Sequence, residues 1–182
     1  VTSGILVVAK DREMASLIST AFQHGKIQKV YFGISTKPPR KKKQGLVQGG
    51  MERSRNKSWK LVVNTKSGTP NSQRTRHPNF AKTRFFTSRI HLNAAERDVD
   101  PLAATVILFR PYTGRTHQLR VAAKSVGIPL MGDPVYLSSD HTDKMEYLPK
   151  VYGASPSVVG VDTSVPRTML HASGIHIPTL VE

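Results

Sequence analysis

Cysteine is absent from this chain of 182 residues. Its absence excludes disulfide bonds, thiolate catalysis and zinc sites built with cysteine. Seven histidines remain as possible metal ligands, but they are scattered without the spacing of a metal site, and His171 with His176 makes only a weak pair. The sequence therefore predicts no metal centre.

Acidic residues are scarce: 12 Asp and Glu stand against 27 Lys and Arg, which gives a net charge of +15 and a pI near 10.4. Such a balance indicates a polyanionic partner, since Lys and Arg that neutralise phosphates release counterions. A membrane surface fits less well, because the chain has no apolar run of about 18 residues and no basic helix with a wide apolar face. The charge favours nucleic acid.

An initiator methionine is also missing, and the opening VTSGILVVAK lacks the charged start of a signal peptide. We interpret the chain as the interior of a longer protein, so that any targeting segment would lie outside these residues. Its length and its 38% of hydrophobic residues suffice for one domain with a core.

Regular structure is predicted mainly as strands, at 4–9, 29–35, 58–63, 81–92, 104–112 and 167–178, with the pair 81–92 and 104–112 antiparallel. Residues 36–60 are expected to be irregular and solvated apart from the short strand, and 64–80 to be turn-rich. We interpret 37–80 as a basic, loop-rich insertion. Strands without a regular alternation of helices indicate the α+β class.

Two helices are predicted. The first follows Asp11 as N-cap and ends at Gly25, and the second follows Thr116 as N-cap and ends at Gly127. The second helix is amphipathic. Its apolar side carries Leu119, Ala122, Ala123 and Val126, and its opposite side carries Arg120 and Lys124.

The segment RPYTGRTHQLRVAAKSVGIPLMGDPVY, residues 110–136, concentrates cations, glycines and prolines. One interpretation is structural, because turns and helix caps need these residue types. The other is functional, because Arg115 and the first amides of the following helix would together form a site for a phosphate or a carboxylate.

A basic run precedes residue 44 and consists of Arg40, Lys41, Lys42 and Lys43. It is either a solvated loop or a contact with a phosphate backbone, and the net charge favours the contact. Trp59, Phe85 and Phe86 either stack on bases or pack in the core, and core packing is the default for aromatic residues on strands.

Residues 110–136 resemble the long signature of the RluA-type RNA pseudouridine synthases, approximately Pro-x-Thr-Gly-Arg-Thr-His-Gln-(Ile/Leu)-Arg-Val, a spacer, and Gly-x-Pro-(Ile/Leu)-x-Gly-Asp-x-x-Tyr. Three further segments resemble the family in the same order: TSGILVVAK, KVYFGI and RTMLHASGIHI. The resemblance covers nearly the whole chain, except roughly 37–80 and 138–166. It implies the family's fold and the cofactor-free conversion of uridine in RNA to pseudouridine.

The resemblance also implies residue roles. Arg115 would pair with a catalytic Asp and keep it ionised, the ring of Tyr31 would stack on the target base while its hydroxyl assists proton removal, and Leu170 would floor the pocket. The target base must be flipped into the pocket. A basic rim would hold the flanking RNA, and its predicted members are Lys29, Arg40, Lys41, Lys42, Lys43, His117, Gln118, Arg120 and Lys124.

The sequence departs from the family pattern at two places. The catalytic Asp of Arg-Leu-Asp-x-x-Thr-Ser-Gly would fall two positions before Val1, because Thr2, Ser3 and Gly4 match the end of that motif. Asp133 does not replace it and is expected to cap a turn. Ala122 stands where the family usually has His, which affects RNA contacts or helix packing rather than the reaction.

The sequence thus predicts a pseudouridine synthase that acts on structured RNA, with ribosomal RNA favoured over tRNA because of the basic insertion, and with a ribosome or pre-ribosomal particle as partner. The alternative is a catalytically inactive RNA-binding or ribosome-assembly factor with the same fold. The residue two positions before Val1 separates the two.

Overall fold

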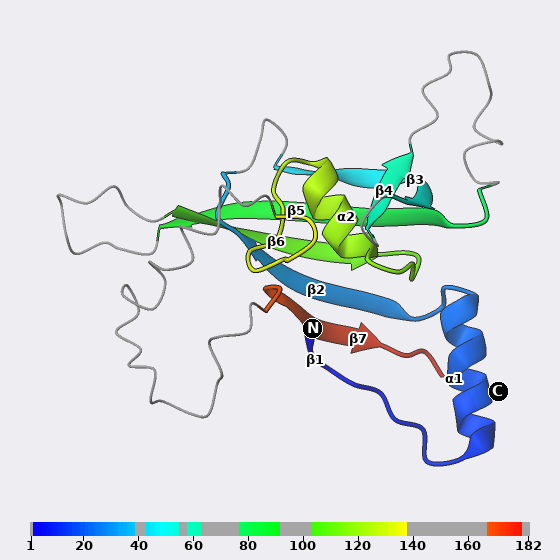
Figure 1. Ribbon diagram of the computed structural model, residues 1–182. Coiled ribbons are helices and arrows are strands. Elements are labelled where there is room, and N and C mark those ends of the chain that lie inside the picture. Colours follow the sequence, from blue (N-terminus) through cyan, green and yellow to red (C-terminus); the bar gives the residue numbers. More distant parts are fainter. Residues whose placement is uncertain are drawn as a thin grey trace.

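The structure is a computed structural model that describes residues 2–38, 43–54, 58–62, 77–91, 103–137 and 167–179. A seven-stranded sheet with the order β1-β7-β2-β6-β5-β3-β4 forms its centre (Figure 1). β1 runs parallel to β7, and the other neighbouring strands are antiparallel. Two helices, α1 and α2, complete an α+β fold, as predicted. The strands are β1 Ser3–Gly4, β2 Gln28–Ser35, β3 Gln44–Arg53, β4 Trp59–Val62, β5 Phe80–His91, β6 Ala103–Pro111 and β7 Leu170–His176.

The helix α1, Arg12–Gln23, begins and ends as predicted. The carboxylate of Asp11 accepts a hydrogen bond from the backbone N–H of Met14 at 2.7 Å, an N-cap that stabilises a helix by about 1 kcal/mol. The chain turns at Gly25 and enters β2. α1 lies beside the end of the sheet, apart from α2 (Figure 1).

The predicted strand at 4–9 is wrong, because β1 ends at Gly4. Gly4 has a φ of 110° and packs so closely on β7 that a Cβ there would overlap the carbonyl of Ala172. The chain then leaves the sheet, and Leu6 and Val8 are 83% and 77% exposed. A β-branched sequence does not form a strand where no neighbouring strand accompanies it.

The expectation that 36–60 is irregular is also wrong, because β3 occupies residues 44–53 in its middle and pairs with β4 on one side and β5 on the other. Val47 and Met51 are buried on one face of β3. Its glycines allow close approach, since a Cβ on Gly49 would lie 2.7 Å from the carbonyl oxygen of Val62. The short strand expected at 58–63 and the antiparallel pair β5–β6 are confirmed.

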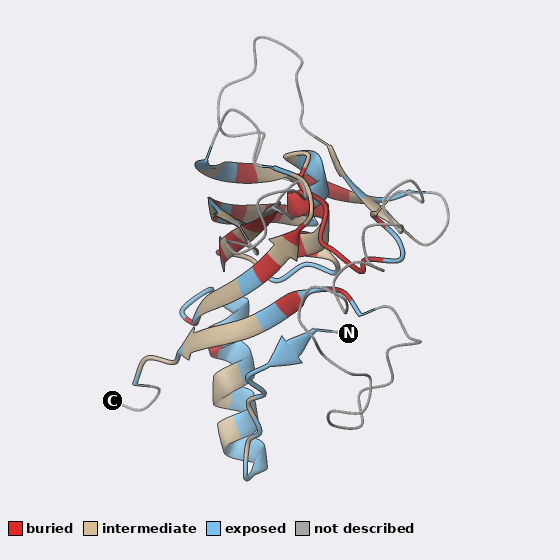
Figure 2. Ribbon diagram, turned by 90° about the vertical axis from the view of Figure 1, so that its left-hand side faces the viewer, coloured by how far each residue is buried: buried red, intermediate tan, exposed pale blue. Residues whose placement is uncertain are grey.

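The helix α2, Gln118–Ser125, covers one face of the sheet and closes the core (Figures 1 and 2). Leu119, Ala122 and Ala123 are buried against the sheet, as predicted, together with Phe109 and Leu170. Buried residues gather between α2 and the middle of the sheet, whereas α1 is largely exposed (Figure 2). Ala122 lies in this core, so the position at which it departs from the expected pattern is a packing position of α2.

The predicted N-cap of the second helix is wrong. His117, not Thr116, occupies that position, with a left-handed φ of 58° and no side-chain hydrogen bond to the helix. The chain turns into the helix at His117, so the first helical residue is Gln118. Neither of the two described helices is long and apolar enough to cross a membrane.

Candidate active site

A pocket of about 300 Å³ opens where β2 and β7 meet the connection between β6 and α2. The described residues of its wall include no Asp or Glu. They are Thr2 beside β1, Lys29 and Tyr31 of β2, Pro111 at the end of β6, Thr113, Gly114, Arg115 and His117 of the connection, Gln118, Leu119 and Arg120 of α2, Thr168 just before β7, and Leu170 at its start.

The three residues predicted to be catalytic, Tyr31, Arg115 and Leu170, lie on this one wall although they are far apart in the sequence. Tyr31 stands on β2 between Phe109 of β6 and Ala172 of β7. Leu170 is 7% exposed and joins the main core. Burial raises the pKa of Tyr31, so its phenol stays protonated at neutral pH. An aromatic ring and an apolar side chain thus line the same pocket as an arginine, and their catalytic roles stay predictions.

Arg115 is held by both its backbone and its side chain. Its backbone N–H donates to Oε1 of Gln118 at 2.9 Å, and its Nε–H donates to the carbonyl oxygen of Phe80 at 3.1 Å. The second bond uses one of the five guanidinium N–H groups. Since Arg115 is exposed, its charge is accessible to an anion in the pocket.

Gln118 was predicted to bind RNA, but its side chain is buried and makes hydrogen bonds within the protein. Its Oε1 accepts from Thr113 Oγ1 at 2.8 Å and from the Arg115 N–H, and its Nε2 donates to the Lys82 carbonyl at 3.1 Å and to Thr83 Oγ1 at 2.8 Å. These bonds fill the donor and acceptor capacity of the amide. Gln118 therefore fastens the β6–α2 connection to β5.

Arg120, the other residue of α2 predicted to bind RNA, forms an ion pair inside the protein. Its Nε and Nη2 donate to Oδ2 and Oδ1 of Asp133 at 2.7 and 2.6 Å. Burial alone raises the pKa of Asp133, but hydrogen bonds from Arg120 and from the N–H groups of Val135 and Tyr136 outweigh it and lower the pKa. The bond to Asp133 in turn raises the pKa of Arg120. Asp133 caps the turn at 133–136, as predicted, and fixes Arg120 as well.

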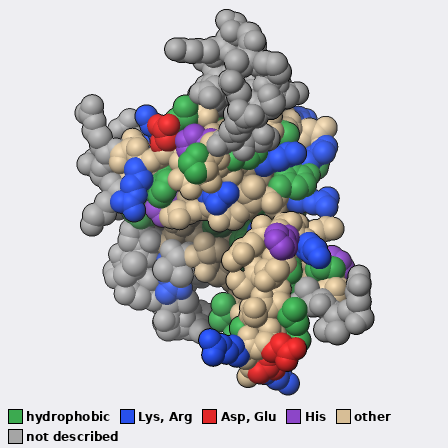
Figure 3. All heavy atoms as spheres, turned by 90° about the vertical axis from the view of Figure 1, so that its right-hand side faces the viewer, with side chains coloured by type: hydrophobic (Ala, Val, Ile, Leu, Met, Phe, Trp, Pro, Cys, Tyr) green, Lys and Arg blue, Asp and Glu red, His purple; other side chains and the backbone are tan. Residues whose placement is uncertain are grey.

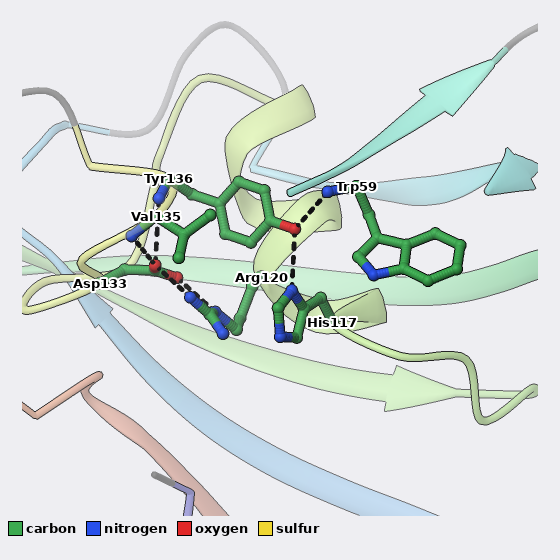
Figure 4. Close-up of polar contacts among 6 residues, drawn as sticks. All are labelled: Trp59, His117, Arg120, Asp133, Val135 and Tyr136. Carbon is green, nitrogen blue, oxygen red and sulfur yellow. Dashed lines mark hydrogen bonds and ion pairs between the residues drawn. The ribbon is translucent and has the colours of Figure 1, made fainter. Parts of the chain in front are cut away.

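His117 is joined to this ion pair through Tyr136 (Figure 4). The hydroxyl of Tyr136 accepts from the backbone N–H of Trp59 at 2.8 Å and lies 3.0 Å from Nδ1 of His117. Burial, and then the charge of Arg120, lowers the pKa of His117, although Asp133 partly opposes this. The lowered pKa favours the neutral imidazole at neutral pH. Because the Tyr136 oxygen already accepts from Trp59, we assign its hydroxyl hydrogen to Nδ1 of His117, which leaves the ring hydrogen on Nε2.

Replacing Tyr136 with phenylalanine is expected to lower the free energy of unfolding by about 1–3 kcal/mol, because the N–H of Trp59 loses its partner inside the protein. His117 should then lose its fixed tautomer, which the ring-carbon chemical shifts in NMR report. Tyr112→Phe is the control, since Tyr112 is exposed. An unchanged tautomer and stability in Tyr136→Phe would contradict the network.

Lys29 extends from β2 into the same pocket. Its Nζ lies 5.5 Å from the centroid of the Phe22 ring, and a Cβ added to Gly114 would lie 3.7 Å from it. Burial lowers the pKa of this amine. The side chain therefore spans the pocket from the sheet to the β6–α2 connection.

The other predicted RNA contacts lie away from the pocket or outside the described residues. Lys124 is exposed on α2, with its Nζ 5.6 Å from the Tyr136 ring centroid. Lys43 is exposed just before β3. Arg40, Lys41 and Lys42 lie outside the described residues. Described Lys and Arg side chains are spread over the face that Figure 3 shows.

The aromatic residues divide between core and surface. Phe85 is buried in the main core, which confirms the default for this residue. Trp59 and Phe86 are only partly buried, and each has a guanidinium over its ring, from Arg53 at 5.7 Å and from Arg84 at 5.3 Å.

The sequence alone did not assign Tyr136, Thr113 and Thr168 to the site. Tyr136 belongs to the Gly-Asp-x-x-Tyr pattern, which was the available signal, but no role followed from its position. Thr113 and Thr168 also lie in segments that resemble the family, but no role followed from their positions, and the fold brings them to the pocket.

The sequence profile of a family described as RNA pseudouridylate synthase matches residues 1–125. An "Uncharacterized RNA pseudouridine synthase" of Haemophilus influenzae is 38% identical over 146 residues, which are 80% of this chain and 54% of that protein. "Ribosomal large subunit pseudouridine synthase C" of Rickettsia conorii is 27% identical over 81% of this chain and 42% of that protein. The chain thus spans about half the length of these relatives.

A solved structure has the same fold. It is titled "Human RNA Pseudouridylate Synthase Domain Containing 1" and superposes with a TM-score of 0.61 at 21% identity, covering 94% of this chain and 58% of that one. At this identity the likeness concerns the fold alone.

Proposed function

Because this chain belongs to the RNA pseudouridylate synthase family, and within it to the RluA type, we propose that it is the catalytic domain of an enzyme that isomerises uridine to pseudouridine in structured RNA. The observation that carries the proposal is the pocket wall shared by Arg115, Tyr31 and Leu170. In this reaction the bond between N1 of uracil and C1′ of ribose breaks and a bond from C5 to C1′ forms. The hydrogen of C5 leaves as a proton and N1 takes up a proton, so that the product is an isomer of uridine.

The nucleophile in this proposal is an Asp two positions before Val1. Thr2 lines the pocket, which supports a place for this Asp close to the pocket. Arg115 faces the same space and would hold the carboxylate ionised and aimed at or beside C1′. The wall supplies the cation for such an acid and, among its described residues, no competing carboxylate.

Tyr31 and Leu170 would retain the base after its bond to ribose breaks. A flat ring above an apolar floor holds a detached uracil by stacking, and this keeps the reacting atoms close. Since the raised pKa of Tyr31 keeps the phenol protonated, stacking and hydrogen bonding by the hydroxyl fit better than proton removal by a phenolate.

The RNA would lie across the basic rim. Lys29, His117, Lys124 and the run from Arg40 to Lys43 are its proposed contacts, whereas Gln118 and Arg120 shape the wall through their internal bonds. Ribosomal RNA is favoured over tRNA, with a ribosomal or pre-ribosomal particle as partner. A relative named for the large ribosomal subunit supports this preference.

Replacing Arg40, Lys41, Lys42 and Lys43 with glutamine is expected to weaken RNA binding and to reduce the slope of log affinity against log salt by about 0.7–0.9 for each phosphate that is no longer neutralised. Filter binding over a series of salt concentrations measures the slope. If the slope of the variant equals that of the parent, the run is a solvated loop.

Release of tritium from RNA labelled at C5 of uridine tests the proposed reaction, because the C5 hydrogen is lost when the new bond forms. The full-length protein should release tritium, and replacing the proposed upstream Asp should abolish release while RNA binding persists. RNA binding without release by the parent would favour the alternative, a catalytically inactive RNA-binding or ribosome-assembly factor.

A further inference from the structure

The charges at the pocket wall are incompletely balanced. Lys29, Arg115 and Arg120 are its cations, and its described residues include no carboxylate. Asp133, which does not line the pocket, forms an ion pair with Arg120 and balances its charge. None of the ion pairs formed among the described residues involves Lys29 or Arg115. Two positive charges therefore face the pocket uncompensated.

Lys29 is the less exposed of these two cations, and its position is fixed by the fold. Lys29 lies opposite Ile175 of β7, and Tyr31 lies between Ala172 of β7 and Phe109 of β6. The register between β2 and β7 shifts between Val30 and Tyr31, and both Lys29 and Tyr31 line the pocket. The amine therefore lies beside the surface proposed to stack the base.

Burial of Lys29 carries a cost that nothing in the described wall offsets. A partly buried ammonium is normally paired with an anion or hydrogen-bonded, and burial lowers the pKa of this one. The ring of Phe22 at 5.5 Å gives only weak compensation. Such an arrangement is typical of a site that a ligand completes.

We propose that Lys29 binds the phosphate of the target nucleotide, so that the pocket recognises a uridine nucleotide rather than a nucleoside. This inference rests on the proposed function, in which Arg115 pairs with the catalytic carboxylate and Lys29 remains for the substrate. A nucleotide fits this site, because its flat base can stack on Tyr31 while its phosphate places a negative charge within reach of the Lys29 amine. An ammonium on a flexible stem suits phosphate as a point charge.

Binding of two small probes to the full-length protein tests the proposal. Uridine 5′-monophosphate should bind the parent about tenfold to a hundredfold more tightly than uridine, as a charge-assisted contact gives. Lys29→Met should lose this preference while its affinity for uridine stays the same. Lys29→Arg should retain most of it. Lys26→Met, which removes an equal charge from an exposed position near β2, should behave as the parent.

Protection of the amine gives a second measurement that does not depend on a variant folding. Reductive methylation of Lys29, followed by mass spectrometry of the peptides, should be slowed by uridine 5′-monophosphate and not by uridine, and Lys26 should be modified equally in all samples. The proposal is overturned if both probes protect Lys29 equally, if neither protects it, or if Lys29→Met keeps the preference for the monophosphate.

Tritium release from C5-labelled RNA separates this inference from the proposed function. With Lys29→Met, the Michaelis constant for RNA should rise more than the turnover number falls. If the parent prefers the monophosphate but releases no tritium, the phosphate site is supported and the proposed reaction is contradicted. If the parent releases tritium but binds both probes equally, the proposed reaction is supported and the phosphate site is contradicted.

Discussion

Arg115→Ala is expected to slow pseudouridine formation by about 100-fold to 1,000-fold, the usual cost of removing a pre-organised electrostatic group from an active site. The proposed partner of Arg115 is a carboxylate of the protein, so RNA affinity should change little. Tritium release under single-turnover conditions measures the rate, and filter binding measures the affinity. Arg115→Lys should recover part of the rate, because the charge remains while the planar donor geometry is lost.

Arg110→Ala is the matched control for Arg115→Ala. Arg110 lies on the neighbouring strand β6, is exposed, and donates to Gln28 Oε1 at 2.9 Å, but it does not line the pocket. Its loss removes the same charge and should leave the rate close to that of the parent. A loss of RNA affinity in Arg115→Ala with unchanged turnover would assign Arg115 to phosphate instead of the carboxylate.

Asp133→Ala is expected to lower the free energy of unfolding by about 3–5 kcal/mol, because it leaves the guanidinium of Arg120 without its buried partner. Asp133 is 1% exposed, and it also accepts from the N–H groups of Val135 and Tyr136. Urea denaturation measures the change. The double variant Arg120→Met with Asp133→Leu should recover much of the loss, since it removes both charges together.

The stability provided by Asp133 also depends on pH. The pKa of Asp133 is lower in the folded protein than its ordinary value of 3.8. Its contribution is therefore present above that value and is lost as the pH falls below it towards the folded pKa. The difference in stability between the parent and Asp133→Asn should shrink below about pH 4. A difference that stays constant down to the acid limit would show that the charge of Asp133 contributes nothing.

The sequence predicts the elements whose burial pattern is regular. Asp11 at the start of α1 and the apolar side of α2 follow from local rules, because an N-cap and a helical stripe are set by neighbours within a few residues. β3 was not predicted because two glycines separate its buried residues, Val47 and Met51. Gly49 packs closely on β4 and Gly50 on the side chain of His77, and neither neighbour can be inferred from the local sequence. Residues 5–9 have the composition of a strand, and composition does not reveal the missing neighbour.

The family signature, rather than local rules, identifies the pocket residues. Tyr31 and Leu170 look like ordinary strand residues, and only the pairing of β2 with β7 brings them to Arg115. Gln118 and Arg120 resemble RNA contacts because they are polar residues beside a cationic loop. Their partners, Thr83 on β5 and Asp133 after α2, become neighbours only through tertiary packing.

We propose that this chain forms the pocket of an enzyme that isomerises uridine in RNA. Pseudouridine mapping across cellular RNA most directly tests it, with three strains compared: the parent, a strain lacking the gene, and that strain carrying the Arg115→Ala variant. We expect one or a few sites, within ribosomal RNA, that vanish without the gene and are not restored by the variant. Identical maps in the parent and in the strain lacking the gene would contradict the claim.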